Sequence, residues 1–242
     1  NAVDYVSKQI GRTRDCMIHR GKEYSYYYGL KDFVKERSLL DMDMIFNKYP
    51  NELFPFDFDT FFQSDTECEL VVTNCRTGDA EYMTEKHDRR RLMDIGRASS
   101  SIPVVSPMVE IDGVPYLDGG IADSIPVGQA MQDGWEKQVI VLTQNKGYVK
   151  KPNKLMPLIR LRYRRYPALC RAMQQRHIDY NRSLQTAQQL EQQGKAVIIQ
   201  PSQPMVLHRV EKDVDKLQAA YENGYHDAAA AWERIQRLFA QE

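Results

Sequence analysis

The sequence predicts an α/β fold with three layers, α/β/α, around a mixed, mainly parallel central sheet. Short, continuously apolar and β-branched runs are typical of buried strands, and they alternate along the chain with longer segments of helical spacing. The composition, with 42% hydrophobic and 27% charged residues in 242, is that of an ordinary globular protein. We expect a single domain over residues 1–242, with a mostly helical C-terminal part, residues 160–242, packed on it.

The N-terminal half predicts short helices before the first strands. Apolar spacing favours helices over residues 1–20 and 41–49, with Asp41 as the N-cap of the second. The aromatic residues at positions 24, 26–28, 54, 56, 58, 61 and 62 are expected to fill a core or line a groove. Residues 69–75 predict a buried strand, residues 80–84 a strand that pairs back on it, and residues 88–99 a helix that ends before Pro103.

Residues 108–117 give the clearest local signal in the chain. Two short alternating runs are joined by Asp112 and Gly113, the residue pair favoured in a two-residue type I′ hairpin turn. The hairpin delivers Asp118 at its exit, directly before Gly119 and Gly120.

The second half of the chain predicts helices separated by two strands. We expect a helix at residues 127–132 ended by Gly134, and a long helix at 167–193 ended by Gly194. Strands are expected at residues 138–143 and 196–200, and the last two helices at 213–221 and 225–240.

Composition excludes several classes of protein. No window reaches the roughly 18 apolar residues of a membrane span, and residues 1–20 lack the apolar run of a signal peptide. Four scattered cysteines are too few for a disulfide scaffold, and no C-x-x-C pair suggests zinc. The sequence therefore predicts a cytoplasmic protein without a metal site.

The zero net charge hides two oppositely charged segments. Residues 41–69 hold eight acidic residues and one base, whereas residues 137–178 hold eleven Lys and Arg and no acid. The second segment indicates either a solvated face or a contact with anionic lipid at the inner membrane face, and the candidate contact residues are Arg160, Arg162, Arg164 and Arg165. Nucleic acid is not an expected partner, because the pI is about 7.1 and no recognition motif is present.

An Asp-Gly-Gly run at a strand end has two interpretations. Asp118 can cap a turn, or it can be a carboxylate that a substrate or another backbone approaches closely, because its neighbours Gly119 and Gly120 carry no side chains.

The surrounding residues favour the second interpretation. Residues 97–103, an apolar segment, residues 111–120, Asp123 and residues 125–127 together resemble the patatin-like phospholipase family. Features further along, at residues 165–167, 180–181, before Pro201 and at 223–225, are similar to its bacterial branch.

The resemblance implies a lipid acyl hydrolase that cleaves phospholipid or related acyl esters with a Ser-Asp dyad. In this pattern Asp118 is the catalytic base, Gly119 and Gly120 support it, and no cofactor is needed. The family's serine lies in a Gly-x-Ser-x-Gly elbow, which these 242 residues do not contain.

We therefore expect the chain to be cut after the nucleophile, so that the oxyanion loop and the elbow precede Asn1. The parent protein is then a serine esterase, and the chain as given is inactive. The alternative is an inactive patatin-like scaffold that binds anionic lipid or a membrane surface.

Overall fold

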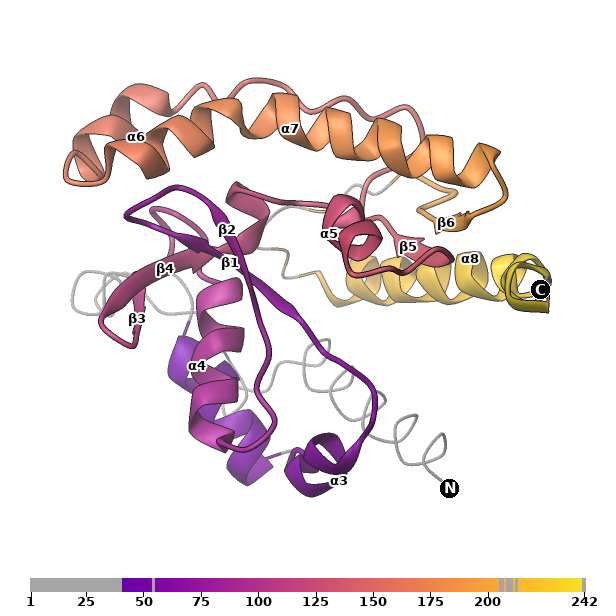
Figure 1. Ribbon diagram of the computed structural model, residues 1–242, viewed down its shortest axis with the longest axis horizontal. Helices are drawn as coiled ribbons and strands as arrows, with labels where there is room; N and C mark the ends of the chain where they lie inside the picture. The colour runs from indigo at the N-terminus through magenta and orange to yellow at the C-terminus, as the bar shows by residue number, and fades with distance from the viewer. Residues whose placement is uncertain (1–40, 54, 205–206, 208–210, 212, 241–242) are drawn as a thin grey trace. The chain divides into compact units, whose positions relative to one another are not determined.

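The computed structural model describes residues 41–53, 55–204, 207, 211 and 213–240 (Figure 1). The helix expected at residues 1–20 lies outside them. The chain divides into two compact units, each made of separate stretches of sequence. Unit 1 is formed by the chain up to Ser124 together with Pro152–Arg176, and unit 2 by Ile125–Lys151 together with the chain from His177 onward.

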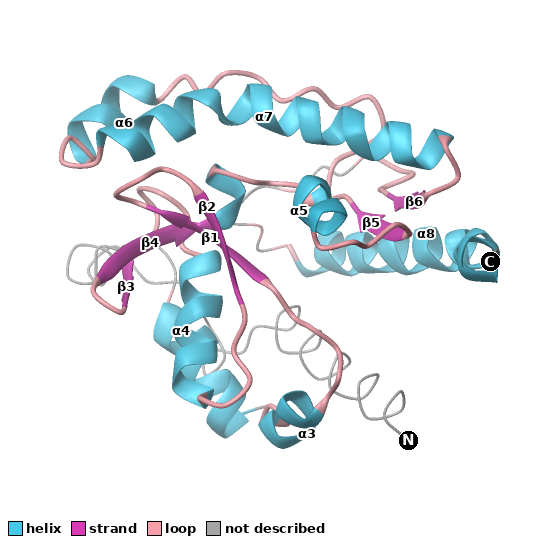
Figure 2. Ribbon diagram, in the orientation of Figure 1, coloured by secondary structure: helices cyan, strands magenta, loops and turns pink. Residues whose placement is uncertain are grey.

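Unit 1 contains a four-stranded antiparallel sheet (Figure 2). Its strands are β1 (Leu70–Asn74), β2 (Ala80–Met83), β3 (Val109–Ile111) and β4 (Val114–Asp118), in the order β2-β1-β4-β3. Two tight turns set this topology, because a hairpin forces its strands to run in opposite directions. Gly78 (φ +81°) lies in the first turn, and Asp112 (φ +51°) and Gly113 (φ +74°) form the second, which confirms the predicted hairpin.

Helices pack on this sheet through alternating strand residues. Tyr116 of β4 lies in a core cluster with Ile95 and Ala98 of α4 (Arg89–Ser99). The next residue, Leu117, lies in a different cluster with residues of α6 (Met156–Arg162) and of the start of α7 (Pro167–Gln192). Successive strand residues point to opposite sides, so β4 is buried by different helices on its two faces.

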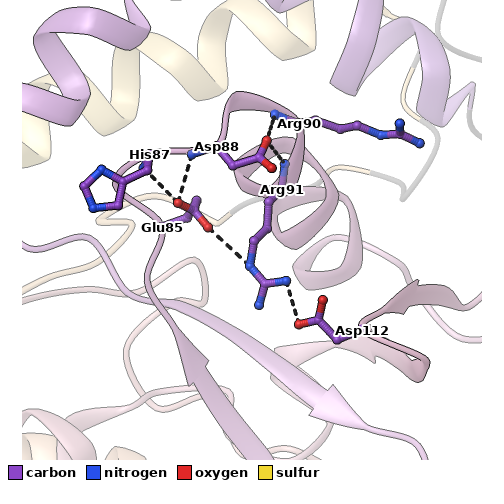
Figure 3. A network of polar contacts seen from close by, with 6 residues as sticks. All are labelled: Glu85, His87, Asp88, Arg90, Arg91 and Asp112. Carbon is purple, nitrogen blue, oxygen red and sulfur yellow. Dashed lines mark hydrogen bonds and ion pairs between the residues drawn. The ribbon is translucent and has the colours of Figure 1, made fainter.

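A polar network fixes the start of α4 (Figure 3). The Asp88 carboxylate accepts hydrogen bonds from the backbone N–H groups of Arg90 and Arg91, as expected of an N-cap. The Arg91 guanidinium then contacts Glu85 at 3.2 Å and Asp112 at 2.6 Å. Because Asp112 lies in the β3–β4 turn, this network ties the helix to the hairpin.

Between residue 41 and β1, the described residues form two helices. Asp41 accepts a hydrogen bond from Met44 N–H at the start of η2 (Met44–Leu53), a π-helix, in agreement with its predicted capping role. The helix α3 (Phe58–Gln63), capped by Asp57, was not predicted. It buries Phe58 among neighbouring phenylalanine rings.

Unit 2 is built around a two-stranded parallel sheet. It contains α5 (Val127–Gln132), β5 (Gln138–Val141), β6 (Ala196–Ile199), the later part of α7, and α8 (Val214–Ala240). Ile140 and Ile198 lie in one core cluster with Leu190 of α7. Gly134 (φ +89°) and Gly194 (φ +71°) follow the ends of α5 and α7, as predicted.

Three predictions differ from this structure. A mainly parallel sheet is wrong for the described residues, in which three strand pairings are antiparallel and one is parallel, because both hairpins lie in the larger sheet. The last two predicted helices form one continuous helix, α8. Across Gly224, the Asn223 side-chain amide donates a hydrogen bond to the Asp227 carboxylate one turn later. Helix α6 forms where none was expected. The three-layer order and the single domain stay predictions.

Candidate active site around Asp118

Backbone contacts hold Asp118 in place at the end of β4. Its N–H donates to the carbonyl oxygen of Ser101 at 3.0 Å, and its own carbonyl oxygen accepts from the Thr73 hydroxyl at 2.8 Å. Ser101 is fully buried just after α4, and its hydroxyl donates to the carbonyl of Arg97. Residues 97–103, which are part of the sequence pattern described above, therefore hold the backbone of Asp118 in place.

The Asp118 carboxylate is half-buried, and one of its oxygens is unused. Oδ1 accepts a hydrogen bond from Gly120 N–H at 2.7 Å, whereas Oδ2 accepts none from the part of the chain that the structure describes. Burial raises the pKa of this carboxyl above its ordinary value, and the Gly120 hydrogen bond and the charge of Arg176 offset part of that rise. A carboxylate in this state is a stronger base than a solvated aspartate.

The two glycines of the motif are needed for different physical reasons. A Cβ at Gly119 would lie 2.1 Å from the carbonyl oxygen of Val71, so only glycine fits where η3 (Gly119–Ile121) crosses β1. A Cβ at Gly120 would lie 3.0 Å from Asp118 Oδ1, directly beside the carboxylate. The first glycine serves the fold, and the second leaves space at the acid.

Arg176 is a part of the site that the sequence did not reveal. Its Nε donates to the carbonyl oxygen of Gly120, which also accepts from the Ser124 hydroxyl at 2.6 Å. Both polar groups of Gly120 are therefore held, the N–H by Asp118 and the C=O by these two donors. The available signal was weak, because Arg176 is one of eleven cations in the acid-free segment and adjoins no motif.

The described residues near Asp118 do not supply a nucleophile. The hydroxyls of Ser101 and Ser124 donate to backbone carbonyls and not to the carboxylate. Cys75 is fully buried, and burial raises the pKa of its thiol to about 12. The arrangement can accept a proton at Oδ2, but the hydroxyl that would donate it is not among these side chains.

The four arginines proposed as lipid contacts lie elsewhere in unit 1. Arg160 and Arg162 are in the last turn of α6, and Arg164 and Arg165 follow before α7. All four are exposed, and among the described residues none of them forms a hydrogen bond or an ion pair with Asp118. The structure thus gathers Asp118, Gly119 and Gly120 in one place and the arginines in another.

The described residues form neither a metal-binding cluster nor a membrane-spanning helix. Among residues 41–53, 55–204, 207, 211 and 213–240, no group of three or more His, Cys, Asp or Glu side chains is arranged to hold a metal ion. Over the same residues, no helix has the length and apolar character needed to cross a membrane.

Comparison with known proteins identifies two segments of the chain. Residues 166–240 match the model of a domain of unknown function, DUF6363, and residues 29–131 match the patatin-like phospholipase model. The chain is also 28% identical over 145 residues to the uncharacterized protein YjjU of Escherichia coli K12, a match that covers 59% of this chain and 40% of that protein. The patatin-like match includes Asp118 and both glycines, and it indicates a lipid hydrolase family, whose members are typically esterases or lipases. The resemblance to patatin-like phospholipases is therefore confirmed over residues 29–131.

Proposed function

We propose that the protein is a lipid acyl hydrolase that cleaves carboxylic esters of phospholipids or related acyl lipids, with Asp118 as the general base of a Ser-Asp dyad. The observation that carries the proposal is the half-buried carboxylate of Asp118 within the matched segment. One of its oxygens is held by Gly120 N–H, and the other accepts no hydrogen bond from the described residues. The partner of Asp118 is proposed to be a serine outside the residues that the structure describes.

Each group has a defined task in this reaction. Oδ2 of Asp118 accepts the serine hydroxyl proton as the serine oxygen attacks the acyl carbon, and the proton passes to the departing alcohol. Water then attacks the acyl-serine ester and gives its proton to Asp118, which passes it to the departing serine oxygen, so that the fatty acid and the free serine are released. Burial supports this role, because the raised pKa of Asp118 makes its carboxylate a better proton acceptor.

Arg176 is proposed as a positioning residue for this base. It holds the Gly120 carbonyl, and the Gly120 N–H in turn holds Oδ1. Loss of Arg176 should therefore lower kcat more than it raises KM, because it alters the orientation and the pKa of the base and touches no substrate.

One observation favours a second candidate, an inactive scaffold that binds anionic lipid. The hydroxyls of Ser101 and Ser124, which lie near Asp118, donate to backbone carbonyls instead. The two candidates differ in whether the native protein carries an activated serine.

The experiment is intact-mass spectrometry of the native protein before and after treatment with a fluorophosphonate, which tags activated serines. We expect one adduct, which Asp118→Asn abolishes. The matched control is Asp112→Asn, which also neutralises an aspartate of the hairpin but lies at its exposed turn. An adduct that persists in Asp118→Asn would refute the dyad, and the absence of any adduct would favour the scaffold.

A further inference from the structure

Helix α6 has an exposed row of leucines that the fold does not use. Leu155, Leu158 and Leu161 are 60%, 51% and 69% exposed, and their three-residue spacing places them within an arc of about 120° on one side of the helix. An adjacent side of the helix already provides the core contacts, through Ile159 at 3% exposure and the partly buried Met156. The packing of α6 in unit 1 therefore does not explain why three leucines lie on its exposed side.

Cations surround this row, and no acid lies near it in the sequence. Lys154 precedes the helix, Arg160 and Arg162 lie in its last turn, and Arg164 and Arg165 follow it. Within the described residues, Arg162, Arg164 and Arg165 make no ion pair, and Arg162 instead lies over the ring of Tyr163 at 5.3 Å. These guanidinium groups are therefore available to bind an anionic partner.

The two features together identify one kind of partner. An apolar face bordered by Lys and Arg is the pattern of a helix that lies in a membrane interface, where leucines enter the acyl boundary and long basic side chains reach lipid phosphates. A nucleic acid would satisfy the cations but would leave three exposed leucines unexplained. A neutral apolar protein surface would cover the leucines but not the cations.

We infer that α6 and residues 163–165 form a docking surface for an anionic lipid bilayer, with Leu155, Leu158 and Leu161 inserted and the arginines on lipid phosphates. This inference goes beyond the proposed hydrolysis and does not depend on it, since the surface lies apart from Asp118. It also concerns a segment, residues 132–165, that neither family match covers.

Vesicle flotation of the full chain tests the inference, with phosphatidylcholine vesicles alone and with about one-third phosphatidylserine. We expect binding to the anionic vesicles that falls as salt is added, because salt screens the contacts with arginine. The triple variant Leu155→Ser/Leu158→Ser/Leu161→Ser should lose at least tenfold in binding. The triple variant Arg162→Gln/Arg164→Gln/Arg165→Gln should lose a similar factor and should also lose the salt dependence.

Two matched variants control for general loss of apolar area or charge. Tyr225→Ser/Trp232→Ser/Phe239→Ser removes three comparably exposed apolar side chains from α8, and Lys146→Gln/Lys151→Gln/Lys195→Gln removes three exposed cations from unit 2. Both should bind as the wild type does. Asp118→Asn should also bind normally, and this separates failure of docking from failure of the proposed catalysis.

A single tryptophan reports insertion directly, without a disruptive substitution. The chain has two tryptophans, Trp135 and Trp232, both exposed, so Leu158→Trp in a background with both changed to Phe places one probe on the leucine row. Brominated acyl chains in anionic vesicles should quench its fluorescence, and Lys146→Trp in the same background should stay unquenched. Equal binding to neutral and anionic vesicles, or unquenched fluorescence from the bound Leu158→Trp variant, would overturn the inference. A leucine variant that changes the oligomeric state instead would identify a second copy of the chain as the occupant.

Discussion

The close approach of η3 to β1 makes Gly119→Ala a sharp test of the fold around the site. The added Cβ would lie 2.1 Å from the Val71 carbonyl oxygen and 2.4 Å from its carbon, whereas ordinary contact begins at 3.4 Å. The two backbones would have to separate by about 1.3 Å to restore ordinary contact. That shift would break the Thr73 contacts that hold Asp118 and its neighbours, because these bonds span 2.8 to 3.3 Å. Overpacking usually costs about 1–3 kcal/mol, and here we expect at least about 3 kcal/mol because the obstacle is strand backbone.

Urea unfolding followed by far-UV circular dichroism measures the loss. The matched control is Gly224→Ala in α8, where a Cβ meets nothing within 4 Å. It should stabilise its helix by about 0.5–1 kcal/mol, because alanine loses less backbone entropy than glycine. If Gly119→Ala unfolds within about 0.5 kcal/mol of the wild type, the described crossing of η3 and β1 is incorrect.

Three further predictions concern polar groups of unit 1. Because burial raises the pKa of Asp118 above 3.8, ionisation of this group costs stability as pH rises through the folded pKa, and the cost is absent below 3.8. The stability of Asp118→Asn relative to the wild type should therefore be greater at pH 7 than at pH 3. Thermal unfolding of both proteins at the two pH values measures this, and an equal difference at pH 3 and pH 7 would contradict it. Thr73→Val should cost about 1–3 kcal/mol in urea unfolding, since it removes the hydroxyl that donates to the Asp118 carbonyl oxygen and leaves Ala122 N–H with its bond to the Gly119 carbonyl alone. Asp88→Ala should cost about 1 kcal/mol through loss of the α4 cap, and Arg91→Ala less than about 1 kcal/mol because its ion pairs are partly exposed; the reverse order in the same assay would refute this ranking.

Local sequence signals predicted the elements that their own residues determine. The hairpin at Asp112 and Gly113 formed as predicted because left-handed backbone is required there, and Asp88, although predicted only as the start of a helix, caps it. Asp118 was placed correctly at a strand exit for the same reason, since it follows the hairpin directly.

Contacts between distant residues explain what was missed. Arg176 is 56 residues from the Gly120 carbonyl that it binds, and no local pattern announces such a contact. The parallel sheet was inferred from apolar runs such as β1, but the continuous burial of a strand does not reveal the direction of its neighbour. Helix α6 was missed because its leucines and arginines do not form the one-sided pattern of a core-facing helix.

The interleaving of the two units along the chain bears on how the protein can fold during synthesis and how it can be divided. Leu117 and Cys75 share their core cluster with Leu169 and Met173, so unit 1 cannot complete its interior until the ribosome has made the first half of α7. A fragment that stops at residue 131, where the patatin-like match ends, would leave that interior open to water. A recombination event that transfers the residues around Asp118 to another protein must therefore also transfer Pro152–Arg176. The part of the chain that must be inherited together is thus larger than the segment matched by the patatin-like model.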